Sequence, residues 1–181
     1  AMVESVRTEA AALLVDGRFE VIRLLGRGGM GEVYLADDRV LGEPVAIKTI
    51  QKRLASRPEI QKMFIAEIQN ARRVNHDNVC RIFDLFADSK VNFFSMEYVE
   101  GERLSERLGG GLSSKESASI ALRLAEGLAK LHATGIIHGD FKPGNVILAR
   151  TNGNPRPVIM DFGLARPIAP AQGVLDKIGG G

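Results

Sequence analysis

The chain contains very little cysteine and no tryptophan. Of its 181 residues, only Cys80 is a cysteine. A single thiol excludes an internal disulfide bond and any metal site built from several thiolates, and it fits a reducing compartment. We therefore expect Cys80 to be a small buried apolar residue, and we expect this part of the protein to be cytoplasmic.

The sequence also lacks three other features. It has no histidine spacing typical of zinc sites, no long apolar run and no large excess of one charge. His76, His132 and His138 are too widely separated in sequence to suggest a zinc site. No stretch approaches the roughly 20 apolar residues that span a bilayer, and no signal-peptide pattern precedes the first apolar run. The formal net charge is only +2, and the basic residues are scattered. We expect neither a nucleic-acid partner nor a membrane contact for this part of the protein, although a parent protein anchored elsewhere is not excluded.

The composition is that of a globular protein, and the first half of the chain alternates short apolar runs with turns. Hydrophobic residues make up 45% and charged residues 25%, which is ordinary for a folded domain. Short apolar runs bounded by Gly and Asp predict strands, whereas apolar residues three or four positions apart predict helices. The predicted strands are 19–25, 32–36, 44–50, 79–86 and 91–99, and the predicted helices are 4–15 and 58–74.

The second half is mainly helical. Ser113 and Glu116 match a capping box, which predicts a helix start, and Gly135 marks the end of that helix. Two short strands follow at 146–148 and 158–160. The pattern predicts an α+β protein with a flanking helix over 1–17, a β-rich lobe with one helix over 18–99 and a mainly helical lobe over 100–181. An apolar stripe lies on one face of the long helix and consists of Ile120, Leu124, Leu128 and Leu131.

Glycines cluster between the first two predicted strands. Gly26, Gly28, Gly29 and Gly31 allow backbone amides to approach a phosphate, because no β-carbon blocks the approach. A glycine-rich hairpin without a ligand would show the same pattern. A dinucleotide-binding fold is excluded, because a helix would follow these glycines whereas a strand does.

A lysine and a glutamate are predicted to face each other beneath this sheet. Lys48 lies within the third predicted strand, where an unpaired ammonium would be costly to bury. Glu67 lies in the predicted helix 58–74. We expect these two residues to form an ion pair that directs the ammonium toward the phosphates of a nucleotide, although a solvated glutamate is the alternative for Glu67.

Polar residues are concentrated in the loop HGDFKPGN at 138–145 and in the turn after the last strand. Asn145 and Asp161 offer oxygen ligands of the kind that Mg²⁺ prefers, with Mn²⁺ as the alternative ion. Asp140 can accept a proton from an attacking hydroxyl, and Lys142 can neutralise charge on a transferred phosphoryl group. Solvated turns would contain the same residue types.

These motifs together resemble a known family. GRGGMGEV, VAIK, a helical glutamate, HGDFKPGN and DFG occur in the order found in the eukaryotic-like protein kinase superfamily. The nearest resemblance is to bacterial Hanks-type serine/threonine kinases. It implies a bilobal fold that binds ATP and Mg²⁺ and transfers the γ-phosphoryl group to a serine or threonine of a protein.

The resemblance also implies which residues bind the adenine ring. Glu97 and Val99 would present backbone groups to the base, with Met96 as the gatekeeper behind it. The residues expected to sandwich the ring are Val33, Ala46 and Ile147.

Two alternative functions stay open. Gly139 stands where the family usually has arginine, and the resulting HGD sequence is favoured by aminoglycoside and choline phosphotransferases, which modify small molecules. A nucleotide-binding, pseudokinase-like regulatory module is the second alternative, although Lys48, Glu67, Asp140 and Asp161 are all present.

The sequence stops where the family continues through its activation segment. We therefore expect a truncated catalytic domain that lacks peptide phosphorylation on its own. The stripe on the long helix would lose part of its cover, which suggests self-association through that surface.

The residue at position 139 generates a prediction about regulation. Without an arginine there, no cation at this position recruits a loop phosphate, and residues 164–181 contain no Ser, Thr or Tyr. Phosphatase treatment of the full-length protein is expected to leave its kinase activity unchanged. Loss of activity on removal of a single activation-loop phosphate would contradict this expectation.

Overall fold

The structure is a computed structural model that describes residues 17–28, 31–49, 58–87, 92–151, 153 and 155–162. The predicted helix 4–15 and the segment 163–181 lie outside the described residues. Within the described part of the chain, no helix is long and apolar enough to cross a membrane.

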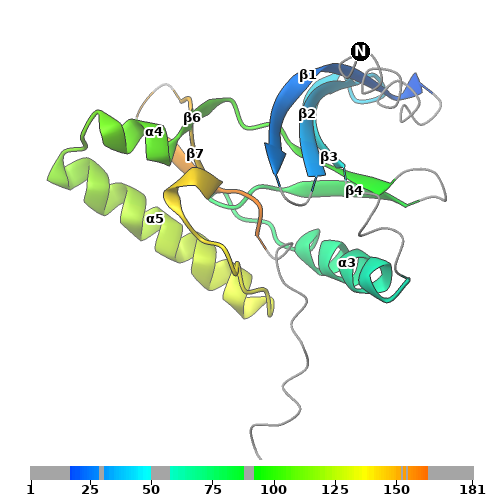
Figure 1. Cartoon of the computed structure of the whole chain (residues 1–181). Helices are drawn as coiled ribbons and strands as arrows, with labels where there is room; N and C mark the ends of the chain where they lie inside the picture. The colour runs from blue at the N-terminus through cyan, green and yellow to red at the C-terminus, as the bar shows by residue number, and fades with distance from the viewer. Residues whose placement is uncertain are drawn as a thin grey trace, which may run out of the picture.

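The first half forms a five-stranded sheet in the order β1-β2-β3-β5-β4, in which all neighbouring strands are antiparallel. The helix α3 (Pro58–Ala71) lies against one side of this sheet (Figure 1). The Ile68 side chain of α3 is fully buried in the main hydrophobic core. The strands are β1 (Phe19–Gly28), β2 (Gly31–Asp38), β3 (Glu43–Thr49), β4 (Ile82–Ala87) and β5 (Asn92–Glu97).

A second apolar cluster lies on the other side of the sheet. The ring of Phe19 makes edge contacts with Phe86 and Phe93, with centroids 5.4 and 6.0 Å apart. The Arg18 guanidinium lies 4.8 Å from the centre of the Phe19 ring and binds the buried carboxylate of Asp38 at 2.7 Å. That hydrogen bond, aided by the backbone amides of residues 40 and 41, holds the pKa of Asp38 below its ordinary value. Apolar side chains of these strands are thus buried on both faces of the sheet.

The second half contains a three-stranded sheet and a long helix. The strands β6 (Gly101–Arg103), β7 (Val146–Ala149) and β8 (Arg156–Ile159) are antiparallel, and the long helix is α5 (Ser114–Ala133). The predicted capping box is confirmed, because Ser113 Oγ accepts from the Glu116 amide and the Glu116 carboxylate accepts from the Ser113 amide. The short elements β6, α4 (Leu104–Gly109) and the 3₁₀ turn η2 (Pro143–Asn145) were not predicted.

The apolar stripe on α5 is buried, so the predicted exposure of this surface is wrong. Ile120, Leu124 and Leu131 are 6%, 8% and 0% exposed, and Leu128 packs against the same core. The helix packs against β8, which supplies the missing cover. Self-association stays a prediction, and this stripe gives it no support.

A connecting segment between α3 and β4 joins the two sheets. Val79 pairs in parallel with Ile159 of β8. The Ile159 amide donates to Asn78 O, and the Cys80 amide donates to Ile159 O, both at 2.9 Å. The side-chain amide of Asn78 also donates to Pro157 O at 2.7 Å. Cys80 is 2% exposed, as predicted, and burial raises the pKa of its thiol. Residues from the first half therefore extend the second sheet.

The start of β6 generates a prediction about stability. A methyl group on Gly101 would lie 2.1 Å from the Leu148 carbonyl oxygen and 2.8 Å from its carbon, both backbone atoms of β7. We expect Gly101→Ala to lower the free energy of unfolding by about 1–3 kcal/mol, measured by denaturant unfolding. Gly109→Ala is the matched control, because nothing lies within 4 Å of the added methyl group. Equal stability of the two variants would contradict the prediction.

Candidate active site

The loop that carries Asp140 is held against the end of β8 by His138. The His138 ring is buried, and its Nδ1 accepts from the Asp140 amide at 3.3 Å. Its Nε2 must then carry the proton, and it donates to Met160 O at 2.9 Å. Met160 directly precedes Asp161, so this histidine fixes two of the predicted site residues relative to each other. This role of His138 was not predicted, although the position of His138 two residues before Asp140 could have indicated it.

Asp140, Lys142 and Asn145 form one hydrogen-bonded group. Lys142 Nζ donates to Asp140 Oδ2 at 2.7 Å. Asn145 Nδ2 donates to Asp140 O at 2.8 Å and to Asp140 Oδ2 at 3.1 Å. The Lys142 hydrogen bond, with help from Asn145, holds the pKa of Asp140 below its ordinary value. The carboxylate is therefore ionised near neutral pH and available to accept a hydrogen bond from a hydroxyl.

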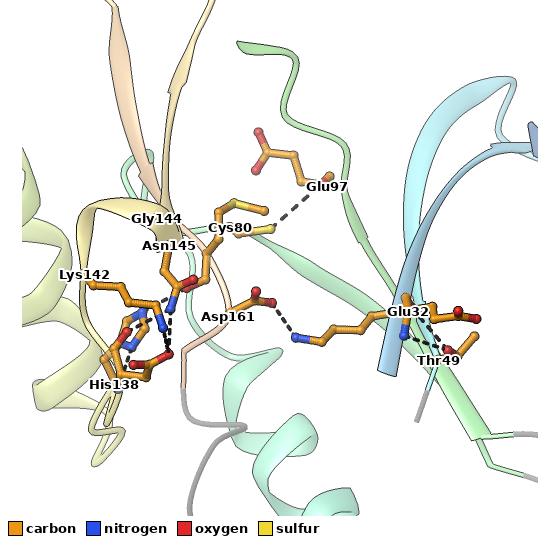
Figure 2. Close-up of polar contacts among 12 residues, drawn as sticks. Glu32, Thr49, Cys80, Glu97, His138, Lys142, Gly144, Asn145 and Asp161 are labelled. Atoms are coloured by element: carbon orange, nitrogen blue, oxygen red, sulfur yellow. Dashed lines mark hydrogen bonds and ion pairs between the residues drawn. The ribbon is translucent and has the colours of Figure 1, made fainter. Parts of the chain in front are cut away.

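Lys48 pairs with Asp161 and not with Glu67, so the predicted Lys48–Glu67 ion pair is wrong. Lys48 Nζ lies 2.5 Å from Asp161 Oδ1, and the lysine side chain is only 9% exposed. Figure 2 shows Asp161 between the group around Asn145 and the strands that carry Glu32 and Thr49. Asp161 adopts a φ of 55°, a left-handed backbone conformation that is uncommon outside glycine. The prediction that Lys48 has an anionic partner is confirmed, but the partner is Asp161 and not Glu67.

Glu67 is half-buried on α3 and has no ion-pair partner among the described residues. Burial raises the pKa of its carboxyl from an ordinary 4.5 to about 7. A glutamate with this pKa is partly protonated at neutral pH. It could bind the Lys48 ammonium only after α3 or Lys48 moved.

The glycine turn lies between the end of β1 and the start of β2. Gly26 is paired with Val33, Gly28 with Gly31, and Val33 with Lys48 on the next strand. Gly31 adopts a φ of 153°, which an L side chain rarely adopts. Gly29 lies outside the described residues. The described glycines thus lie on β1 and β2, and β2 pairs with β3, the strand that carries Lys48.

The residues expected around adenine share one apolar cluster. Ala46, Met96 and Val99 are buried in the main core, and Val33 and Ile147 pack against it. Ala46 is the register partner of Met96. These five residues therefore lie together, although they come from β2, β3, β5, the segment after β5 and β7. Their role in binding a base stays a prediction.

Glu97 is held in place by Arg156, a residue that was not predicted to be part of the site. Arg156 Nη2 on β8 binds Glu97 Oε1 at 2.9 Å, and its Nη1 donates to Asp77 O. The Glu97 amide donates to Arg81 O at 2.8 Å, and the Cys80 thiol lies 3.7 Å from Glu97 O. No sequence spacing linked positions 97 and 156. The ion pair joins the end of β5 to the second sheet.

The donor set of Asn145 and Asp161 fits a divalent cation that prefers oxygen ligands. The Asn145 amide nitrogen is used by Asp140, which directs its Oδ1 to the opposite side. Asp161 uses one carboxylate oxygen for Lys48, and its side chain is 37% exposed. A carboxylate and an amide oxygen suit Mg²⁺ or Mn²⁺ far better than zinc.

Comparisons with known proteins agree on one family. The family model described as protein kinase domain matches residues 19–179. The serine/threonine-protein kinase Pkn1 of Myxococcus xanthus is 38% identical, over 83% of this chain and 22% of the relative. The serine/threonine-protein kinase PrkC of Bacillus subtilis (strain 168) is 35% identical, over 86% of this chain and 24% of the relative. This chain thus spans less than a quarter of either relative.

A solved structure shares the fold. The crystal structure of the Mycobacterium tuberculosis PknI kinase domain has a TM-score of 0.70 and 28% sequence identity to this chain. The match covers 82% of this chain and 61% of that chain. The predicted α+β fold and the resemblance stated from the motifs are both confirmed.

The raised pKa of Glu67 generates a prediction about pH. The folded chain holds this proton up to about pH 7, whereas an ordinary glutamate releases it near 4.5. The folded state therefore binds more protons between these values, so the stability of the wild type falls as pH rises through this window. We expect Glu67→Gln to raise Tm relative to wild type by about 2–4 °C at pH 8, after allowance for solvent screening, and by much less at pH 4.5.

The matched control for this measurement is Glu126→Gln. Glu126 is exposed on α5, so its substitution should leave the pH dependence of Tm unchanged. Parallel Tm curves for wild type and Glu67→Gln across pH 4.5–8 would contradict the prediction.

Proposed function

We propose that this chain, which belongs to the protein kinase domain family, is part of an enzyme. This enzyme would transfer the γ-phosphoryl group of ATP to a serine or threonine of a protein. The observation that carries the proposal is the convergence of two polar groups. One is the hydrogen-bonded set of Asp140, Lys142 and Asn145, and the other is the ion pair between the buried Lys48 and Asp161. Both are attached to the end of β8, one through His138 and Met160 and the other directly.

The buried ammonium of Lys48 would bind the phosphates of ATP. In the structure it is neutralised by Asp161 at 2.5 Å. A cation that is 9% exposed makes a strong interaction with an incoming phosphate, because little water screens it. The described glycines at the end of β1 and the start of β2 would let backbone amides approach the same phosphates.

Asn145 and Asp161 would hold Mg²⁺, with Mn²⁺ as the other ion that fits their oxygens. When bound, such an ion neutralises the negative charge of the phosphoryl oxygens. Loading this site requires Asp161 to share or release Lys48. Asn145 and Asp161 would thus be the two ligands, and the Lys48 ammonium would compete with the metal ion for Asp161.

Asp140 would orient the attacking hydroxyl and accept its proton. Its carboxylate is exposed, ionised and held by Lys142 and Asn145. Lys142 lies close enough to stabilise negative charge on the transferred group, since its Nζ is only 2.7 Å from Asp140 Oδ2. In this chemistry most of the rate acceleration comes from positioning and charge stabilisation.

The two alternative functions receive less support. The matched relatives Pkn1 and PrkC are both named serine/threonine-protein kinases, which favours a protein substrate over a small alcohol. The complete polar set argues against a module that only binds nucleotide. Lys142, two residues after Asp140, is the residue found in serine/threonine rather than tyrosine kinases.

The decisive experiment replaces Asp140. In the full-length protein, Asp140→Asn is expected to reduce phosphotransfer to a serine or threonine protein substrate by at least about 100-fold, because the proton acceptor is lost. Binding of ATP is expected to stay within a few-fold of wild type. The measurements are transfer of labelled phosphate and nucleotide titration.

The matched control is Asp37→Asn, an exposed position on β2, which should transfer phosphate at the wild-type rate. Wild-type transfer by Asp140→Asn would contradict the assignment of the proton acceptor. Transfer by the wild type only to small amino alcohols would favour the small-molecule alternative, and nucleotide binding without any transfer would favour the regulatory module.

A further inference from the structure

Arg103 lies between the glycine turn and the loop that carries Asp140. It ends β6, four residues after Val99, and its backbone is paired with Ile147 of β7. Its Nη1 donates to Gly144 O at 2.5 Å. A methyl group placed on Gly26 would lie 3.9 Å from its Nη2. The guanidinium therefore extends from the second sheet to the beginning of the glycine turn.

The positive charge of Arg103 is not neutralised by the acidic residues around it. Glu100 binds Arg150 at 3.0 Å, and Glu102 lies 3.7 Å from Arg107. The Glu106 carboxylate accepts from the backbone amide of Arg103 at 3.3 Å. Within the described part of the chain, the guanidinium itself has only the Gly144 carbonyl as a hydrogen-bond partner.

The space beside the guanidinium is open. Arg103 is exposed, and a methyl group on Gly144 would meet nothing within 4 Å. A guanidinium has five N–H donors in a planar fork that suits a carboxylate or phosphate. Most of these donors remain available to a ligand in front of Gly144.

We propose that Arg103 is a specificity-determining residue that binds an acidic side chain of the protein substrate near the acceptor serine or threonine. This inference rests on the proposed function. Gly144 is the direct neighbour of Asn145, whose side chain binds Asp140. The Gly144 carbonyl and the Asn145 side chain thus connect the Arg103 guanidinium to the Asp140 carboxylate. A substrate peptide with its acceptor hydroxyl at Asp140 would place a neighbouring side chain near Arg103, because each extended residue spans about 3.3–3.6 Å.

The protein substrate is a better source of this anion than the nucleotide. The phosphates of ATP are expected at Lys48, whose side chain is only 9% exposed, and at its partner Asp161. Arg103 follows the segment expected to bind adenine, so the part of the nucleotide nearest to it would be the uncharged sugar. An anion that reaches Arg103 from the exposed side would therefore belong to the second substrate.

The test measures the charge preference of the full-length enzyme. A series of serine peptides carries Asp, Asn or Lys at one position at a time, from three residues before the acceptor to three residues after it. We expect wild-type kcat/KM to favour Asp over Lys by about tenfold or more at one of these positions, the order expected for a charge-assisted hydrogen bond. Arg103→Glu should reverse this ratio at the same position, whereas Arg103→Lys should keep its direction with a smaller value.

Arg150→Glu is the matched control, because it makes the same change of charge at an exposed position in the second half and should retain the wild-type ratio. If Arg103→Glu folds poorly by thermal unfolding, Arg103→Gln gives the same readout, with loss of the preference expected. A wild type that phosphorylates these peptides without any charge preference contradicts this inference alone. The inference is also contradicted if the Arg103 variants have a raised KM for ATP but an unchanged ratio of kcat/KM between Asp and Lys peptides. A wild type that transfers phosphate to no protein or peptide contradicts the proposed function as well.

Discussion

The burial of β8 is the constraint on which the site depends. Val158 and Ile159 are completely buried, and the backbone polar groups of such a strand must find partners inside the protein. β7 supplies them on one side and residues 78–80 on the other, while α5 covers the strand with its apolar stripe. The strand is therefore fixed on all sides, and so is the turn that follows it. Met160 then holds both Asn145 and His138, and Asp161 reaches Lys48.

The electrostatics of the site follow from this arrangement. Lys48 is almost fully buried and needs an anion, because a lone buried ammonium is costly. Two carboxylates approach this region, one from the turn after β8 and one from α3. The structure uses Asp161, and desolvation then leaves Glu67 with a pKa of about 7. Uptake of nucleotide and metal would redistribute this charge, since Lys48 and Asp161 are each expected to gain a new partner.

The sequence predicted the site better than it predicted the pairing within it. The group of Asp140, Lys142 and Asn145 lies within six residues, so a short turn was enough to bring these side chains together. The apolar positions Ala46, Met96 and Ile147 were placed through the family resemblance, and they share a cluster. The Lys48 partner was predicted wrongly because Glu67 and Asp161 are equally plausible by charge alone. Arg103 and Arg156 were missed because neither belongs to a periodic pattern or a recognised motif.

The sequence by itself determined the longer strands and helices, their order and most chemical groups of the site, because strand and helix periodicity, capping and turn residues act over a few neighbouring positions. Only the tertiary structure decided which distant groups meet. It showed that β8 covers the stripe on α5, that residues 78–80 extend the second sheet and that Asp161 neutralises Lys48. The physical reason is that burial and ion pairing depend on distances between segments up to 113 positions apart, which are set only when the two sheets pack together.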